Sequence, residues 1–259
     1  MSIRSMLVIF CLPVLLFVTA IAGAQDDNPE VMLDPPDSPE KVVAGPEYDV
    51  VELTCPLDGK KVSGKQVKSF ISAGTDRDFC EIGAGQSLYG LWITCCDDGY
   101  CGYIEDFSNV NLKSSVREKI KKEILPNFNM KDLPPWEKYY ITAKIYEWRG
   151  KSQLVIANTY LRATYTMRGL PGEPQIRKRE KELRALAIEH FIKAERAGLV
   201  PLVQVPNMKY LIGELYRRNE KFKKAIGYFD DSLKIKNRPD WLEKWVLKQK
   251  ALALAEYPF

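Results

Sequence analysis

Histidine is almost missing from this chain. The one histidine among 259 residues is His190, in "ALAIEHFIKA", and it lies on or beside the apolar stripe of its predicted helix, so we expect it to be packed there. A serine or cysteine triad needs a histidine with a partner, and no partner is apparent. The glycine-rich run "EIGAGQS" lacks the lysine of a phosphate loop. We therefore expect a non-catalytic protein without a recognisable catalytic constellation.

A strong excess of one charge is also missing. The 38 basic and 34 acidic residues leave a net charge of +4, and a nucleic-acid-binding protein usually carries a larger, clustered excess. We therefore expect no nucleic-acid partner. Most basic runs alternate with acids, as on solvated helix faces. Basic side chains cluster at one interhelical turn, the candidate site for an acidic peptide or anionic headgroup: Arg217, Arg218, Lys221, Lys223 and Lys224.

Apolar runs long enough to span a membrane are absent as well. The longest run, Met6 to Ile21, falls short of the roughly 20 residues that a spanning helix needs. It follows the basic Arg4 and precedes "AGA", which is the plan of a secretory signal peptide over residues 1–24. The sequence thus predicts export to the periplasm or the outside. Membrane contact is expected only if this leader stays uncleaved.

Three segments follow the leader. Residues 25–48 are rich in proline and acids without an apolar period, which predicts a flexible linker. Residues 49–110 hold "YDVVELT" and "SLYGLWIT", whose β-branched and aromatic residues predict strands. This module carries five of the six cysteines. Residues 111–259 change to helical spacing and form the predicted helical domain.

Helical periodicity dominates the second half of the chain. The run "NLKSSVREKIKKEIL" predicts a connecting helix, and the two prolines of "PPWEKYY" open the next one. Six further helices are predicted with short breaks between them, at about 136–149, 152–168, 174–197, 206–219, 221–236 and 239–255. The fold class is therefore mainly α, with a small β-rich module at the N-terminal side.

Two of these helices have the spacing of a tetratricopeptide repeat. In "YLIGELYRRNEKFKKAIGYFDDSLKIKNRP", the small Gly213 and Ala225 let two antiparallel helices approach, while aromatic side chains such as Phe229 fill the space around the contact. Glu220 occupies the turn position where a glycine is expected. Since one repeat cannot cover its own apolar faces, about three stacked pairs are expected. An irregular bundle with one repeat-like pair is the alternative.

The run "YLIGELYRR", together with "PPWEKYYITAKIYEWRGKS" and a module carrying "CP" and "CGY", resembles a bacterial family known as domain of unknown function number 2225. The resemblance covers roughly residues 52–233. It implies a zinc-ribbon-like head on a tetratricopeptide-like helical body, and it implies no established reaction.

In that family the head looks like two Cys-x-x-Cys knuckles, which suit a structural zinc ion. Here the first knuckle reads Cys55-Pro-Leu-Asp58, and Asp98 stands where the second knuckle would begin. The predicted zinc ligands are Cys55, Cys80, Cys96 and Cys101, with Asp58 as a replacement ligand. Export favours disulfides instead, because nearby thiols pair in an oxidising compartment. A reactive thiol is the third alternative.

These observations lead to one functional prediction. We expect an exported, non-catalytic scaffold whose helical surface binds a protein or peptide, since stacked helix pairs form a groove as they pack. The alternative is a thiol-active or metal-dependent extracytoplasmic protein that uses the cysteine cluster.

Overall fold

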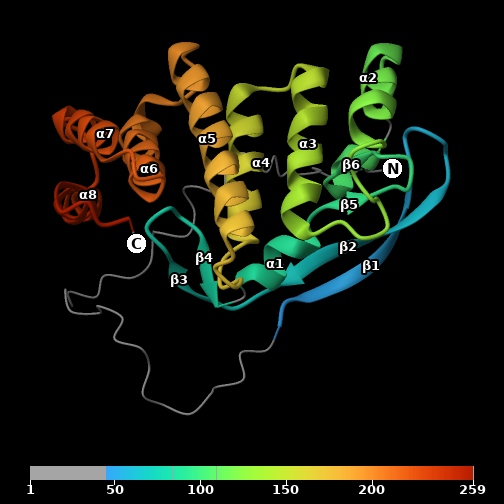
Figure 1. Cartoon of the computed structure of the whole chain (residues 1–259), viewed down its shortest axis with the longest axis horizontal. Coiled ribbons are helices and arrows are strands. Elements are labelled where there is room, and N and C mark those ends of the chain that lie inside the picture. The colour runs from blue at the N-terminus through green and yellow to red at the C-terminus, as the bar shows by residue number, and fades with distance from the viewer. Residues whose placement is uncertain (1–44, 84, 109, 259) are drawn as a thin grey trace, which may run out of the picture. The chain divides into compact units, whose positions relative to one another are not determined.

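The computed structural model (Figure 1) describes residues 45–83, 85–108 and 110–258. The predicted signal peptide and residues 25–44 of the predicted linker lie outside the described residues. Within the described part, residues from Gly45 onward belong to one compact unit, Val42–Phe259. This unit is mainly helical with small antiparallel strand pairs near its N-terminal side, so the predicted fold class is confirmed at this level. None of the described helices has both the length and the apolar content to cross a membrane.

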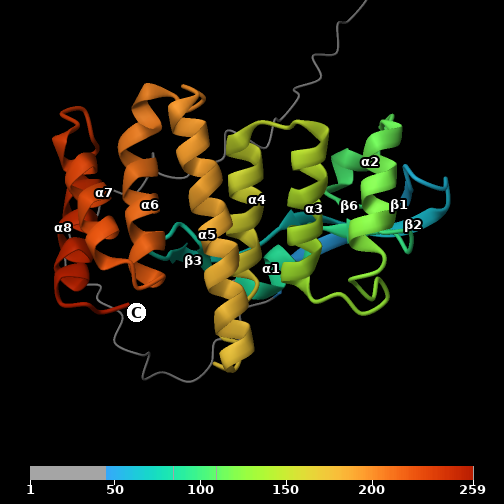
Figure 2. The same ribbon diagram turned by 45° about the horizontal axis from the view of Figure 1, so that its top comes forward.

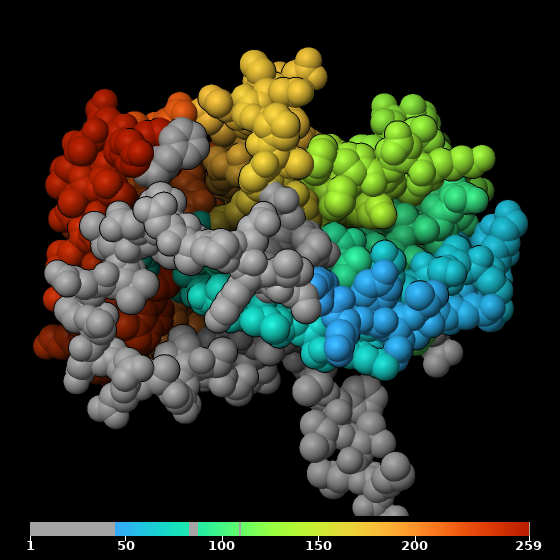
Figure 3. Space-filling model, turned by 90° about the horizontal axis from the view of Figure 1, so that it is seen from below, coloured from blue at the N-terminus to red at the C-terminus, as the bar shows by residue number. Residues whose placement is uncertain are grey.

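Three short antiparallel strand pairs make up the first part of the unit. β1 (Glu47–Thr54) pairs with β2 (Lys61–Ser69), and Thr54 stands opposite Lys61 at the closed end of this hairpin. The other pairs are β3 (Ser72–Thr75) with β4 (Glu81–Gly83), and β5 (Thr94–Cys95) with β6 (Cys101–Gly102). Figure 3 shows the β1–β2 hairpin, in blue, at the surface of the face seen from below.

One strand prediction is wrong. Most of "SLYGLWIT" lies in helix α1 (Gly85–Leu91), and only its last residue, Thr94, begins a strand. A strand would send neighbouring side chains to opposite faces, but the neighbours Leu88 and Tyr89 are both buried. Aromatic and apolar enrichment without alternation therefore did not identify a strand here.

The helical part follows the sequence periodicity closely. It begins with α2 (Ser114–Lys119), which continues as a single π-helical turn, η2 (Ile120–Ile124). The six predicted helices correspond to α3 (Pro135–Arg149), α4 (Gln153–Tyr165), α5 (Pro174–Arg196), α6 (Val205–Arg218), α7 (Phe222–Lys234) and α8 (Asp240–Leu254). Short 3-10 turns are η1 (Ile104–Phe107) and η3 (Leu202–Gln204). In Figures 1 and 2, α3, α4, α5 and α6 lie side by side in chain order.

Local signals set the helix ends. Helix α3 starts with Pro135 in its first turn, where the missing N–H costs nothing, and ends at Gly150, whose φ of 68° is left-handed. Ser152 then caps α4 by accepting a hydrogen bond from the backbone N–H of Leu154. At the α6–α7 turn, Glu220 adopts a φ of 60°. The turn thus requires the left-handed conformation that a glycine would take more easily.

The α6–α7 contact depends on a small residue. A Cβ atom built on Gly213 would approach the ring of Phe229 to 2.7 Å and the backbone oxygen of Ala225 to 3.3 Å. Both Ala225 and Phe229 are fully buried. The predicted close approach at Gly213 and Ala225 is therefore present.

The strand module and the helices share one core. The buried cluster that contains Cys55, Cys96 and Cys101 continues through Ile120 into helices α3, α4, α5 and α6. The hydroxyl of the buried Tyr139 on α3 donates a 2.8 Å hydrogen bond to the backbone oxygen of Tyr89 on α1. The cysteines therefore lie where the strands meet the helices.

Candidate functional site

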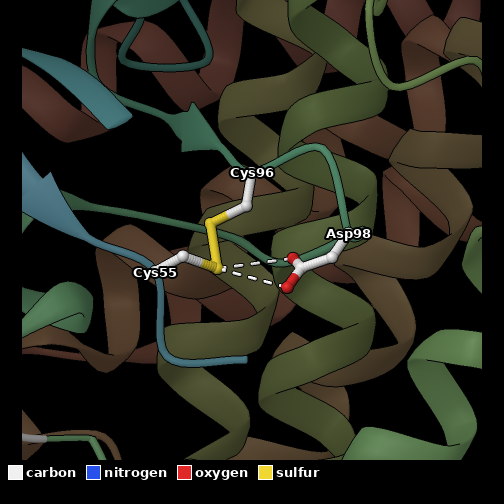
Figure 4. A group of neighbouring side chains, drawn as sticks. All are labelled: Cys55, Cys96 and Asp98. Carbon is white, nitrogen blue, oxygen red and sulfur yellow. Dashed lines mark hydrogen bonds between the residues drawn. A yellow bond between two sulfur atoms is a disulfide. The ribbon is translucent and has the colours of Figure 1, made fainter. Parts of the chain in front are cut away.

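Two strand ends bring Cys55, Cys96 and Asp98 together (Figure 4). Cys55 directly follows β1, and Cys96 directly follows β5. Their sulfur atoms form a disulfide, with the two Cα atoms 6.2 Å apart. The Sγ atom of Cys55 also lies 3.3 and 3.4 Å from the two carboxylate oxygens of Asp98. Both cysteines are buried, whereas Asp98 is partly exposed.

A tight turn between β5 and β6 positions Asp98. The backbone N–H of Cys96 donates to the oxygen of Tyr100 over 2.8 Å, and Gly99 takes a φ of 95° at the tip. A Cβ atom at Gly99 would come within 2.9 Å of Ile120. Glycine is therefore needed both for the backbone conformation and for the close packing of this turn on η2.

A second disulfide closes the same turn. Cys95 and Cys101 stand directly opposite each other on β5 and β6 and are bonded, with Cα atoms 4.1 Å apart. Because neighbouring side chains on a strand point to opposite faces, Cys95 and Cys96 reach different partners. The two disulfides together join the end of β1 to the β5–β6 hairpin.

Cys80 lies apart from both disulfides. It is a free, buried thiol next to the turn between β3 and β4. Burial raises the pKa of the Cys80 thiol to about 12. The thiol therefore stays protonated at neutral pH and lacks the thiolate character of a reactive cysteine.

The structure brings together only part of the predicted ligand set. Of the four predicted cysteines, Cys55 and Cys96 are in contact, Cys101 is bonded to Cys95, and Cys80 is elsewhere. The predicted replacement ligand Asp58 forms a 2.9 Å ion pair with Lys60.

The carboxylate that reaches the sulfurs is Asp98, which the predicted ligand set did not include. Its signal in the sequence is the spacing Asp98-x-x-Cys101, which mirrors Cys55-x-x-Asp58.

These three groups have donor atoms that suit a zinc ion. The ligand atoms of Cys55, Cys96 and Asp98 all lie within 4.8 Å of one another, and thiolate and carboxylate are accepted zinc ligands. A disulfide sulfur is not a thiolate, so the metal and the disulfide exclude each other. Burial, and then the negative charge of Asp58, raise the pKa of Asp98. The residues therefore fit three of four zinc ligands, and only in the reduced state.

The predicted anionic-partner patch is divided by the fold. Arg217 is buried and forms a bidentate ion pair with Glu214, at 2.7 and 2.8 Å. Arg218 binds the same carboxylate and also reaches the β3–β4 turn. The lysines of the patch, at positions 221, 223 and 224, are exposed. Two of the five predicted cations are therefore neutralised inside the molecule.

A buried ionic network attaches the β3–β4 turn to the helices. Arg168, after α4, binds both Asp76 and Asp78, and Arg218 on α6 lies 3.1 Å from Asp76. The hydroxyl of Tyr165 donates to the backbone oxygen of Asp78 over 2.5 Å. Burial acts to raise the pKa of Asp76, but the charges of Arg218 and Arg168 lower it well below the ordinary value. Charge pairing of this kind stabilises the docked hairpin.

His190 belongs to a second polar cluster, whose members the sequence did not indicate. Its Nε2 lies 3.3 Å from Glu147 on α3, and its Nδ1 lies 2.7 Å from Gln153 on α4. Tyr160 and Lys144 also donate to Glu147, over 2.5 and 2.6 Å. Burial acts to raise the pKa of Glu147, but hydrogen bonds from His190, Lys144 and Tyr160 lower it to about 2.

The polar groups of this cluster are therefore joined to one another by hydrogen bonds and ion pairs. His190 is packed, as expected, and it joins α5 to α3 and α4. We assign the cluster a structural role. The single histidine gave no signal of its partners, because they are 37 and 43 residues away in sequence.

An aromatic pocket lies between η2 and α3. It has a volume of about 170 Å³, and its aromatic walls are Phe128, Tyr140 and Trp148. Trp148 is flanked by two cations, with the Nζ atoms of Lys119 and Lys144 5.8 and 5.9 Å from its ring centre. Ile124, the last residue of the π-helical turn, also lines the pocket, and Glu123, Asn127 and Lys144 complete the lining. Single π-helical turns are rare in proteins, and those that occur often lie at functional sites.

The fold and the site define a class: a mainly helical protein joined through one core to a small, disulfide-bonded strand module. The chain belongs to the bacterial family described as "Uncharacterized protein conserved in bacteria" (DUF2225), whose model matches residues 51–253. The family resemblance of the sequence motifs is thus confirmed. No curated protein matches the chain significantly, and no solved structure does so either.

Proposed function

We propose that this protein is an exported, non-catalytic scaffold that binds a protein or peptide partner. The observation that carries the proposal is the pocket walled by Phe128, Tyr140 and Trp148. Aromatic side chains in a pocket are the usual energetic centres of protein interfaces. The three rings are only partly buried by the protein's own core. They can therefore gain further burial against a partner.

The chemistry of the pocket favours an apolar anchor next to an acidic residue. The aromatic walls suit an aliphatic or aromatic side chain, while Lys119 and Lys144 at Trp148 suit a carboxylate. Lys144 is already paired with Glu147 at 2.6 Å, so Lys119 is the cation that is freer to meet the partner. A short peptide with one anchor and a neighbouring acid would satisfy both features.

The arrangement of the helices supports the same function. Helices α3 to α8 follow one another with short connections, and α6 and α7 approach closely at Gly213. In our proposal they stack as tetratricopeptide-like pairs, a type of array that commonly presents an extended binding surface. Export is supported by the leader-like N-terminal sequence and by the two disulfides, because disulfides persist in oxidising compartments.

A random-peptide display library selected on the full chain tests this proposal. Selected peptides should share an apolar anchor beside an acidic residue, and their binding should change the fluorescence of Trp148. The substitution Trp148→Ala should weaken binding about tenfold to a hundredfold, as expected for an aromatic hot spot.

The matched control is Leu247→Ala, because Leu247 is 52% exposed in the middle of α8. This substitution should leave the affinity for the selected peptides unchanged. Peptides that bind Trp148→Ala as well as the unchanged protein would contradict the proposal, provided that circular dichroism shows both to be folded.

A second candidate function rests on Cys55, Cys96 and Asp98, whose ligand atoms lie within 4.8 Å of one another. In this alternative, a dithiol reductant donates two electrons to the disulfide, and the two thiolates with Asp98 then bind one zinc ion. Zinc analysis combined with thiol counting tests it. Zinc bound by the reduced chain but not by the Cys55→Ser/Cys96→Ser variant would support this candidate. No zinc bound by the chain in its reduced or its oxidised state would exclude it.

A further inference from the structure

The connection between α5 and α6 exposes an unusual amount of apolar side chain. Leu202 is 89% exposed, Val203 is 67% exposed and Leu199 is 45% exposed. All three are exposed large apolar side chains, and they lie within five consecutive positions. Scattered single apolar residues are ordinary on a surface, but a contiguous group marks a contact site.

The connection is built to hold these side chains outward. Helix α5 ends at Arg196, Gly198 follows with a left-handed φ of 65°, and the backbone N–H of Leu199 donates to the oxygen of Ala194 over 3.0 Å. Val200 is then buried in the core. The following 3-10 turn, η3, carries Leu202 and Val203, and it is closed by a 2.8 Å bond from the N–H of Gln204 to the oxygen of Pro201. The exposed group is therefore a fixed apolar knuckle.

Two exposed cations lie at the same end of the helices as the knuckle. Figures 1 and 2 both place the α5–α6 connection and the α3–α4 turn at the same end of these helices. Arg196 in the last turn of α5 and Lys151 in the α3–α4 turn are exposed. Within the described part of the chain, neither has a carboxylate at ion-pair distance. The nearby acids are already compensated, since Glu189 binds Lys193 and Glu195 binds Lys209, both at 2.6 Å.

We propose that the knuckle Leu199–Val203 inserts into an anionic lipid surface, with Arg196 and Lys151 at the headgroups. Apolar side chains on a protruding turn enter the interfacial region of a bilayer, and neighbouring cations are attracted to anionic lipids. A second copy of the chain is a poorer occupant, because a symmetric contact would bring the same uncompensated cations face to face. This contact is separate from the aromatic pocket and goes beyond the proposed scaffold function.

A site-specific fluorescent label tests insertion in the full chain. In a Cys11→Ser/Cys80→Ala background, which removes the other free thiols, Leu202→Cys is labelled with an environment-sensitive dye, and Leu247→Cys serves as the matched control because residue 247 is also exposed. The labelled proteins are titrated with vesicles of pure phosphatidylcholine and with vesicles that contain phosphatidylglycerol. Cys11 is replaced because a dye attached there would report lipid contact of the predicted leader. A dye at position 202 reports lipid contact of the knuckle.

We expect a blue shift and quenching by lipid-attached quenchers at position 202 with the anionic vesicles, and neither effect at position 247. Arg196→Glu with Lys151→Glu should raise the lipid concentration at half-maximal shift about tenfold or more. The proposal is overturned if the label at 202 stays in water while vesicles are present, or if both labels shift alike. A shift that needs no vesicles and grows with protein concentration would identify a second copy, and a shift caused only by an acidic peptide would identify a protein partner. Either result would overturn lipid insertion.

Discussion

The disulfide between Cys55 and Cys96 should supply a large part of the stability of the fold. The two residues are 41 positions apart, and closing a loop of that length in the unfolded chain corresponds to about 4 kcal/mol of stabilisation. The disulfide between Cys95 and Cys101 spans only 6 positions and corresponds to about 2 kcal/mol. Since single domains are stable by about 5–15 kcal/mol, the difference between the two should be measurable.

The test compares two double variants, Cys55→Ser/Cys96→Ser and Cys95→Ser/Cys101→Ser. Each is unfolded in urea under non-reducing conditions and followed by far-ultraviolet circular dichroism. We expect the first variant to lose about 2 kcal/mol more unfolding free energy than the second. Equal losses would refute the loop-closure reasoning. A free energy unchanged in both variants would show that neither disulfide constrains the unfolded chain.

Three further predictions concern the packing and the buried charges. Gly213→Ala should destabilise the protein by about 1–3 kcal/mol, because the added methyl group meets Phe229. Gly227→Ala, where nothing lies within 4 Å of the added Cβ, should stabilise the protein or leave its stability unchanged. Urea unfolding that ranks the two variants the other way would contradict the close α6–α7 contact at Gly213. Arg168→Ala should lower the unfolding free energy by about 3 kcal/mol, because it removes a partner of the buried Asp78. Lys223→Ala on the surface should lower it by less than about 0.5 kcal/mol. Equal losses in the two variants would show that the ionic network adds no stability. The pKa of Glu147 is lowered to about 2 in the folded protein, so the stability that Glu147 contributes is complete above its ordinary pKa near 4.5 and is lost as the pH falls through 2. Glu147→Gln should therefore flatten the plot of unfolding free energy against pH over that window. An unchanged slope would exclude a stabilising role of the ionised Glu147.

The helices were the predictable part of this fold. Their apolar residues recur with helical spacing, and residues such as Pro135 and Gly150 mark their ends locally in the sequence. The close α6–α7 contact also followed from local spacing, because Gly213 and Ala225 are both on the predicted repeat pattern. These signals require no knowledge of distant contacts.

The site was less predictable because it depends on pairings between distant segments. Nothing in the sequence near Cys55 selects Cys96 over Cys101 as its partner. In the fold, the pairing of β5 with β6 sets Cys101 opposite Cys95, and Cys96 is bonded to Cys55. The ion pair between Arg168 and Asp78 joins residues 90 positions apart. Local charge patterns could not show that Arg218 would turn inward to the same network.

Site-specific photo-crosslinking in the bacterium tests the scaffold function most directly. A photoreactive amino acid is placed at Asn127, on the lining of the aromatic pocket, and at Lys223, exposed on α7. We expect a defined protein adduct from position 127 that disappears when Trp148→Ala is added, and no such adduct from position 223. The same adducts from both positions, unaffected by Trp148→Ala, would contradict it.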